Sequence, residues 1–410
     1  MTSSLWTKFT STTMVVLLLL ALLPAGVLYG QMQKKGAPLA KIPVASSALI
    51  KWLDPETAYE QNKVNAKPFF IDVYTSWCGW CKRMDQTTFQ DPVVAQYINT
   101  HFYPIKFNAE TSDTINFLER QYVNSQKGYV VNYLGQADSV IKSKNDSLQL
   151  LSSSVADTVL YKAVRTRLQV ATSDRQQMAR KGRKTTHDFA IDLMNKQMSY
   201  PTFVILFDSL RNNFPLKGYQ KPTQLLSVLS FFKEDVYKQT NQLQDYQELF
   251  NKTFSQGLPP NNVWQSIKET ADSSVVNKKK TLVLLTNNQT YTSIVMEKAV
   301  YASDSVVAIL QEKFNVTKLD LFSKDSVVFK GTTFKNQGNY HDLVVSLMQT
   351  EKRFPCLVVL DENQNLVFRI PGFFLPTDLV PTLRFVDGEV YKTKVTFNEF
   401  KTAYQKQLKK

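Results

Sequence analysis

Cysteine and histidine are both scarce in this chain, with three of each among 410 residues. An exported protein stapled by disulfides carries more cysteines in an even number, so these three indicate chemistry and not a disulfide framework. A zinc site needs four ligands, and Cys78 and Cys81 have no second cysteine pair to complete one. The composition therefore predicts no metal. A permanently oxidised structural disulfide between Cys78 and Cys81 stays open as an alternative to a redox role.

Long hydrophobic runs are also missing. The run Met14–Leu23 falls short of the roughly 20 residues that a membrane span needs. It follows a lysine and precedes a proline, and Gly30 offers a cleavage point, so residues 1–30 are predicted to be a signal peptide, followed by a linker at 31–48. Leu28 departs from the small-residue rule for cleavage, which leaves an uncleaved anchor as the alternative. The expected location is periplasmic or secreted, with no stable span beyond the signal.

The net charge of +14 raises the question of nucleic acid or an anionic membrane as a partner. The basic residues are scattered, apart from short clusters at 180–184 and 278–280. Neither cluster is interleaved with the aromatic residues that single-strand binders use for stacking. Nucleic acid is therefore not among the predicted partners.

An internal repeat organises the rest of the chain. A shift of 212 residues pairs Trp52 with Trp264 and, without a gap, continues past Phe102 and Phe314. Further along, a shift of 154 residues pairs His187 with His341, and it also pairs the prolines at 201 and 355. The two copies are thus related over most of their length.

The change of shift, 212 − 154 = 58, places an extra 58 residues in the first copy. This insertion, at about 125–183, is rich in Ser, Gln, Asn and Thr, has no clear period and receives no function. The predicted domains are therefore a first copy at 49–252 with this insertion, a linker and helix at 253–277, and a second copy at 262–410.

Each copy has the same predicted order of elements. In the first copy a helix at Asp54–Asn62 precedes an apolar strand at Phe69–Tyr74, a helix after the cysteines and a strand at Tyr103–Phe107. A helix ending near Met198, a strand at Thr202–Phe207 and a last strand up to Gly218 follow, then closing helices. In the second copy the counterpart of the apolar strand is Thr281–Leu285. Alternating strands and helices that end in a β-hairpin and a helix predict an α/β sandwich with a mixed sheet.

The stretch Ile71–Lys82, with Trp-Cys-Gly-Trp-Cys-Lys at its end, together with Tyr200-Pro201-Thr202-Phe203 and Gly218, resembles the thioredoxin family. The likeness is to secreted bacterial members in which CGWC replaces CGPC. It covers about 50–250 without the insertion, and more faintly 262–406. The resemblance implies two thioredoxin-like folds in tandem, each with a mixed central sheet flanked by helices, the second without CxxC.

The cysteines have a physical reason to react. A CxxC at the start of a helix puts both sulfurs on the first turn, where free N–H groups and the helix dipole favour a thiolate. Cys78 is then the expected nucleophile and Cys81 the thiol that resolves the mixed disulfide. Gly79 is expected to permit a tight turn. Trp80, where the family often has proline, is expected to change the reduction potential.

Asp72 interrupts an otherwise apolar strand six residues before Cys78, where an unsatisfied carboxylate would be costly. The resemblance makes Asp72 a buried general base for Cys81. Lys106 matches a family lysine near that acid, and an exposed strand lysine is the competing interpretation. Trp77 and Lys82 flank the motif and are expected to shape the site.

The resemblance also makes Pro201 a cis-proline beside the active site. Tyr200, the residue before it, is then expected to pair its backbone with the substrate.

The second copy has Leu284, Thr290 and Ser293 opposite Asp72, Cys78 and Cys81. Loss of the acid together with both thiols is expected if the acid serves the cysteines and not the fold. The second copy is therefore predicted to be a non-redox module. Cys356 follows Pro355 and is interpreted as a buried apolar residue, with a reactive thiol as the alternative. The shared histidines are interpreted as structural.

These residues predict an exported thiol–disulfide oxidoreductase, a protein of thioredoxin type. It would reduce or exchange disulfides in other exported proteins and rely on an electron donor or acceptor that the chain does not contain. Its only redox group would be the Cys78–Cys81 disulfide, with no added cofactor. The alternative is a non-enzymatic binding or chaperone-like protein built from two thioredoxin folds.

Overall fold

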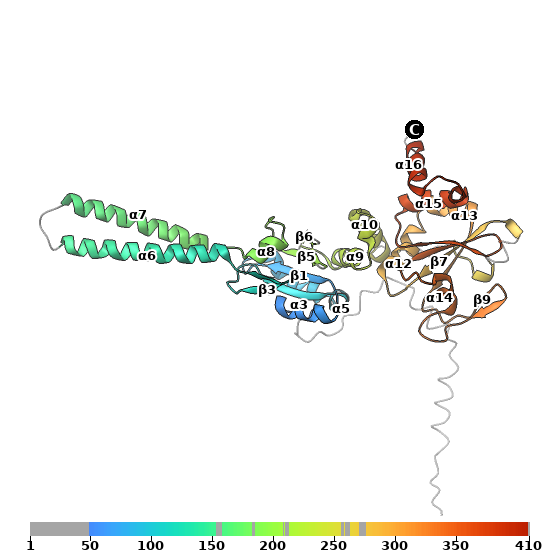
Figure 1. Cartoon of the computed structure of the whole chain (residues 1–410), viewed down its shortest axis with the longest axis horizontal. Coiled ribbons are helices and arrows are strands. Elements are labelled where there is room, and N and C mark those ends of the chain that lie inside the picture. The colour runs from blue at the N-terminus through green and yellow to red at the C-terminus, as the bar shows by residue number, and fades with distance from the viewer. Residues whose placement is uncertain are drawn as a thin grey trace, which may run out of the picture. The chain divides into compact units, whose positions relative to one another are not determined.

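The computed structural model describes residues 49–152, 158–182, 185–207, 209, 213–255, 258, 263–269 and 276–408. The predicted signal at 1–30 and the linker at 31–48 lie outside these residues. Figure 1 shows the α/β architecture and two separate central sheets. We call the described residues from 49 to 255 the first module and those from 263 to 408 the second module.

The sheet of the first module has four strands in the order β2-β1-β5-β6. Its strands are β1 (Phe69–Tyr74), β2 (Tyr103–Asn108), β5 (Thr202–Leu206) and β6 (Asn213–Lys217). β1 pairs in parallel with β2 and antiparallel with β5, and β5 is antiparallel to β6. The mixed sheet predicted from the sequence is confirmed.

Helices cover both faces of this sheet, because β1 is apolar on both of its faces. Side chains alternate along a strand, so Phe69, Ile71 and Val73 enter one core while Phe70 enters the other. By the same alternation Asp72 shares the face of Phe70, which is the face that Met84 packs against.

The other elements of the first module are α3 (Pro55–Val64), α4 (Gly79–Gln86), η1 (Thr88–Gln90), α5 (Pro92–His101), β3 (Ile115–Phe117), β4 (Arg120–Tyr122), α6 (Ser125–Ser152), α7 (Thr158–Gly182), α8 (Asp188–Leu193), α9 (Pro222–Lys233), η3 (Val236–Lys238) and α10 (Leu243–Ser255). The predicted insertion is the pair of long helices α6 and α7, which run side by side in Figure 1. α10 continues three residues past 252, the expected end of the first domain, to Ser255.

The second module repeats the sheet order of the first. Its strands β7 (Lys280–Thr286), β8 (Phe314–Asp320), β11 (Cys356–Leu360) and β12 (Leu366–Pro371) lie in the order β12-β11-β7-β8, with β7 and β8 parallel. Both modules also have a cis X-Pro peptide in front of the third strand of the sheet, at Tyr200–Pro201 and Phe354–Pro355.

The remaining elements of the second module are α12 (Tyr291–Val295), η4 (Met296–Val300), α13 (Asp304–Lys313), β9 (Val327–Phe329), β10 (Thr332–Phe334), α14 (Asp342–Met348), α15 (Pro376–Asp387), η5 (Val390–Lys392) and α16 (Phe397–Gln407). Among the described residues, no helix combines the length and the apolar character needed to cross a membrane.

Candidate active site

Cys78 and Cys81 form a disulfide at the start of α4, with their Cα atoms 5.3 Å apart. Cys78 is the N-cap of this helix, and its Sγ accepts a hydrogen bond from the backbone N–H of Cys81 at 3.1 Å. After reduction, the same N–H and the helix dipole would stabilise a thiolate at this position. Both side chains are only 4% exposed, so the sulfurs lie just below the surface.

Gly79 is the first residue of α4 and does not have a positive φ. A Cβ built at this position would meet no atom within 4 Å. The local backbone therefore does not require glycine at this position.

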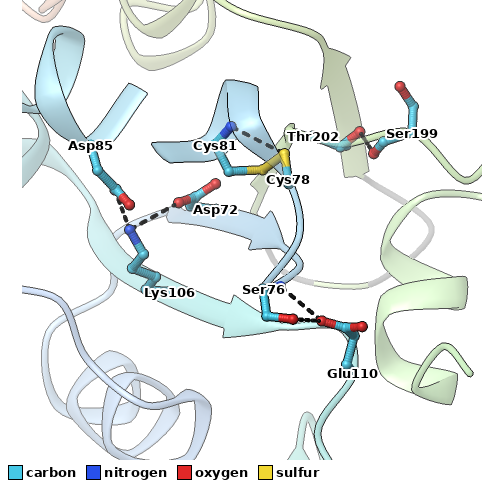
Figure 2. Close-up of a disulfide and its surroundings, with 9 residues drawn as sticks. All are labelled: Asp72, Ser76, Cys78, Cys81, Asp85, Lys106, Glu110, Ser199 and Thr202. Atoms are coloured by element: carbon cyan, nitrogen blue, oxygen red, sulfur yellow. Dashed lines mark hydrogen bonds and ion pairs between the residues drawn. A yellow bond between two sulfur atoms is a disulfide. The ribbon is translucent and has the colours of Figure 1, made fainter. Parts of the chain in front are cut away.

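Asp72 lies beneath the disulfide on β1, buried to 2% exposure. Its Oδ2 is 3.6 Å from Nζ of Lys106 on the neighbouring strand β2, and its Oδ1 has no hydrogen-bond partner among the described residues. Figure 2 shows the carboxyl between the lysine and the disulfide. Burial raises the pKa of Asp72 to about 7, against the opposing effect of the Lys106 cation.

Asp85, which the sequence analysis missed, forms an ion pair with Lys106 from the end of α4. Its negative charge adds to the rise in the pKa of Asp72. The shift of 212 residues held a signal for this pair, because it matches Asp85 with Glu297 and Lys106 with Lys318. These two counterparts also form an ion pair in the second module. The acid–lysine pair therefore occurs in both modules, whereas the buried Asp72 occurs only beside the cysteines.

Glu110 is the second residue that the sequence analysis missed. Its carboxylate accepts hydrogen bonds from the N–H and the hydroxyl of Ser76, both at 2.7 Å, and from the indole N–H of Trp77 at 3.0 Å. Figure 2 shows Glu110 against Ser76, two residues before Cys78. Glu110 thus fixes the loop that leads into the disulfide.

Two exposed tryptophans flank the disulfide, and each rests on a tyrosine. Trp77 is 61% exposed and contacts the ring of Tyr200 edge to face, with the centroids 5.7 Å apart. Trp80 is 62% exposed and packs on Tyr219 with the centroids 5.6 Å apart. We call these four aromatic residues the rim. The rim offers a large apolar surface to a partner that approaches the sulfurs.

Pro201 follows Tyr200 in a cis peptide bond, as the sequence analysis expected. The side chain of Lys82 is exposed.

The second module has hydroxyls where the first has sulfurs. Thr290 donates a hydrogen bond to Oγ of Ser293 at 2.9 Å. The carboxylate of Glu234, from the end of α9, accepts hydrogen bonds from the backbone N–H groups of Tyr291 and Thr292 at 3.1 and 2.8 Å. Glu234 therefore caps the first turn of α12, the turn that corresponds to the cysteine-bearing turn of α4. Burial raises the pKa of Glu234.

The remaining candidates have local structural surroundings. His187 and His341 cap the starts of α8 and α14 through Nδ1, and their Nε2 atoms lie 2.9 and 3.0 Å from the carbonyl oxygens of Asp113 and Asp325. Cys356 is fully buried on β11, and burial raises the pKa of its thiol to about 12. A thiol with such a pKa is not activated at neutral pH.

The sheet order, the disulfide at the start of α4 and the cis-proline define the first module as a thioredoxin-type fold. Residues 43–136 match the family model Thioredox_DsbH, described as a protein of unknown function, DUF255. The family resemblance drawn from the sequence is thus confirmed, and the chain contains a module of thioredoxin type. An uncharacterized protein of Caenorhabditis elegans is 30% identical over 74 residues, which are 18% of this chain and 10% of that protein. The match therefore spans only a tenth of that relative.

Three solved structures are similar to this chain at low identity. A thioredoxin-fold protein from Helicobacter pylori is 14% identical with a TM-score of 0.26, covering 40% of this chain and 95% of that one. A DsbH oxidoreductase is 17% identical with a TM-score of 0.21, covering 26% and 71%. A disulphide isomerase from Xylella fastidiosa Temecula1 is 13% identical with a TM-score of 0.21, covering 37% and 98%.

Proposed function

We propose that this chain is a thiol–disulfide oxidoreductase that reduces or exchanges disulfides in other proteins through Cys78 and Cys81. The observation that carries the proposal is the disulfide at the N-terminus of α4 with a buried carboxyl, Asp72, beside it. A structural disulfide needs neither feature. The second module supports this view, because it keeps the fold while it lacks the sulfurs and the acid.

The reaction begins from the dithiol form, which an external dithiol donor generates. The Cys78 thiolate attacks one sulfur of a substrate disulfide, a mixed disulfide forms, and the other substrate sulfur leaves as a thiolate. Cys81 then loses its proton and attacks Sγ of Cys78. The second substrate thiolate leaves and the Cys78–Cys81 disulfide is restored. Two electrons pass from the chain to the substrate, and the reverse sequence oxidises a substrate dithiol.

Asp72 is the group proposed to accept the proton of Cys81. A carboxyl with a pKa of about 7 is present in both protonation states at neutral pH, so it can take up a proton and release it again. The cation of Lys106, on the side of Asp72 away from the disulfide, stabilises the carboxylate form of Asp72.

We further propose that the protein works in the periplasm or outside the cell, on exported proteins. The apolar run Met14–Leu23 and the cleavage point at Gly30 support export. A non-enzymatic binding protein built from two thioredoxin folds is the rival proposal, supported by the second module, which has no cysteine pair. In that case Cys78→Ser/Cys81→Ser would leave the cellular function intact.

Trapping of mixed disulfides tests the proposal. In the variant Cys81→Ala/Cys356→Ala, Cys78 is the only thiol and no thiol can resolve its mixed disulfides. We expect covalent complexes with exported proteins, detected by mass spectrometry and released by a reductant. The matched control Cys78→Ala/Cys356→Ala keeps Cys81, the resolving thiol in this scheme, and should trap few proteins. Equal trapping by the two variants, or none by either, would contradict the proposed roles.

A further inference from the structure

The helical hairpin of α6 and α7 has little core of its own. Of its described residues only Val130 is buried, and the ion pair between Arg175 and Asp138, with Nη2 and Oδ2 3.0 Å apart, joins the two helices. Gly182 permits close packing at the base, because a Cβ there would lie 2.6 Å from Val130. With 28 residues in α6, the hairpin reaches about 40 Å from its base. Most of its surface is therefore available to a partner.

The base of this hairpin is bonded to the segment that fixes the active-site loop. Asn124, just before α6, donates a hydrogen bond from Nδ2 to the carbonyl of Thr111 at 3.0 Å. His187, just after the hairpin, donates its backbone N–H to the carbonyl of Ala109 at 2.8 Å. Glu110, which holds Trp77, lies between these two acceptors. The base of the hairpin is thus hydrogen-bonded on either side of the residue that holds Trp77 of the rim.

The surface of the hairpin is basic with isolated apolar side chains. Residues 125–182 contain nine Lys and Arg residues against four Asp residues, a net charge of +5. Lys162, Arg165 and Arg167 on α7 are all exposed. Tyr129 and Val140, both exposed, lie three turns apart on one face of α6, and Val159 and Val170 have the same spacing on α7.

A hollow at the base of the hairpin combines basic and apolar side chains, because Lys181 lines it together with Tyr129, Val130 and Met178.

We propose that the hairpin is a docking arm for disulfide-bearing protein substrates with an acidic surface. This inference rests on the proposed function of Cys78 and Cys81. A second copy of the chain is a poor occupant, because two hairpins of +5 repel each other. A lipid surface fits poorly too, since an interfacial helix presents a continuous apolar face, whereas Gln136 and Ser143 separate the apolar residues of α6.

The test measures how fast Cys78 of a Cys81→Ala chain forms mixed disulfides with three probes. These are calcium-free α-lactalbumin as an acidic disulfide protein, lysozyme as a basic one, and the small disulfide DTNB. The docking variant is Lys162→Glu/Arg165→Glu/Arg167→Glu. The matched control, Lys324→Glu/Lys394→Glu/Lys406→Glu, makes the same charge change at exposed residues of the second module.

We expect the docking variant to lose about tenfold in rate with α-lactalbumin at low salt, while its rate with DTNB stays unchanged. The loss should vanish between about 0.01 M and about 1 M salt, as the Debye length falls from roughly 30 Å to roughly 3 Å. An equal loss in the control variant, or no loss in the docking variant, would overturn the proposal. So would hairpin-dependent binding to phosphatidylglycerol vesicles or a hairpin-dependent dimer in place of the effect on α-lactalbumin.

A second variant replaces residues 125–186 by Gln-Gly-Asn-Tyr, the sequence that joins Asn336 to His341 in the second module. In that module Asn336 donates to the carbonyl of Ser323 at 3.0 Å, as Asn124 does to Thr111, so the short connection suits the fold. This variant should keep the DTNB rate and lose the preference for α-lactalbumin over lysozyme.

Failure of the proposed function gives a different result. If Cys78 did not react with DTNB or any other disulfide, the oxidoreductase proposal would fail. Docking would then be decided by binding of α-lactalbumin to the oxidised chain, measured by fluorescence anisotropy. Salt-sensitive binding that the docking variant loses would support the arm, and its absence would overturn it.

Discussion

Substitution of Asp72 by asparagine should make the stability of the first module depend less on pH. The pKa of Asp72 rises from 3.8 to about 7 on folding, mainly because the carboxyl is buried. The folded chain therefore binds more protons than the unfolded chain between about pH 4 and pH 7, and its stability falls as the pH rises through this window. A shift of roughly 3 pH units corresponds to about 4 kcal/mol, since one unit is worth 1.36 kcal/mol.

Asn has the shape of protonated Asp and carries no charge. The Asp72→Asn variant should therefore not lose stability as the pH rises through this window. We expect the variant to exceed the parent in free energy of unfolding by up to about 4 kcal/mol near pH 8, and to match it near pH 4. Urea unfolding, followed by tryptophan fluorescence in a Trp264→Phe background, reports mainly on the first module. The exposed Asp174→Asn should show no such difference. A constant difference between Asp72→Asn and its parent from pH 4 to pH 8 would refute titration of Asp72 near neutrality.

Three further predictions concern single side chains. Lys106→Met removes the cation that lowers the pKa of Asp72, so the midpoint of the pH–rate profile for closure of the disulfide should move above its parental value. An unchanged midpoint would show that Lys106 does not affect the titration of this carboxyl. Glu110→Ala removes the acceptor of the hydrogen bonds from Ser76 and Trp77, and should slow mixed-disulfide formation while the circular dichroism stays unchanged. An unaltered rate would show that these hydrogen bonds do not matter for the reaction. Glu234→Ala leaves N–H donors of α12 without their acceptor and should lower the free energy of unfolding by about 2 kcal/mol in urea titrations, with Glu234→Gln showing a smaller loss.

The sheet and the sulfur site could be predicted because short-range patterns determine them. Phe69–Tyr74 was predicted with its observed bounds, since it is an apolar run with turn residues nearby. The helix after the cysteines follows from the position of the CxxC between this strand and the next. The three-residue strands β3 and β4 were missed because they are too short to show an alternating pattern.

The hairpin was missed for a different physical reason. A two-helix arm without a third layer buries little, so its inner positions tolerate Ala137 and Lys144 beside Ile141, and its outer positions carry Val131 and Val140. The helical period is therefore blurred in the sequence.

Asp85 and Glu110 were missed because each acts through a partner distant in the sequence. Asp85 reaches Lys106, and Glu110 reaches Trp77 from 33 residues away. The comparison of the two copies held part of the signal. The second copy retains the acid–lysine pair as Glu297 and Lys318. In that copy a phenylalanine stands opposite Glu110, and the counterpart of Trp77 is not a tryptophan either.

The reduction potential of the Cys78–Cys81 disulfide tests the central claim most directly. It is measured by equilibrating the chain in redox buffers and counting free thiols by mass spectrometry. A catalytic pair should have a potential between roughly −270 mV, the value of a reductase, and roughly −120 mV, the value of an oxidant. A potential below about −300 mV, as structural disulfides have, would contradict a catalytic role for this pair.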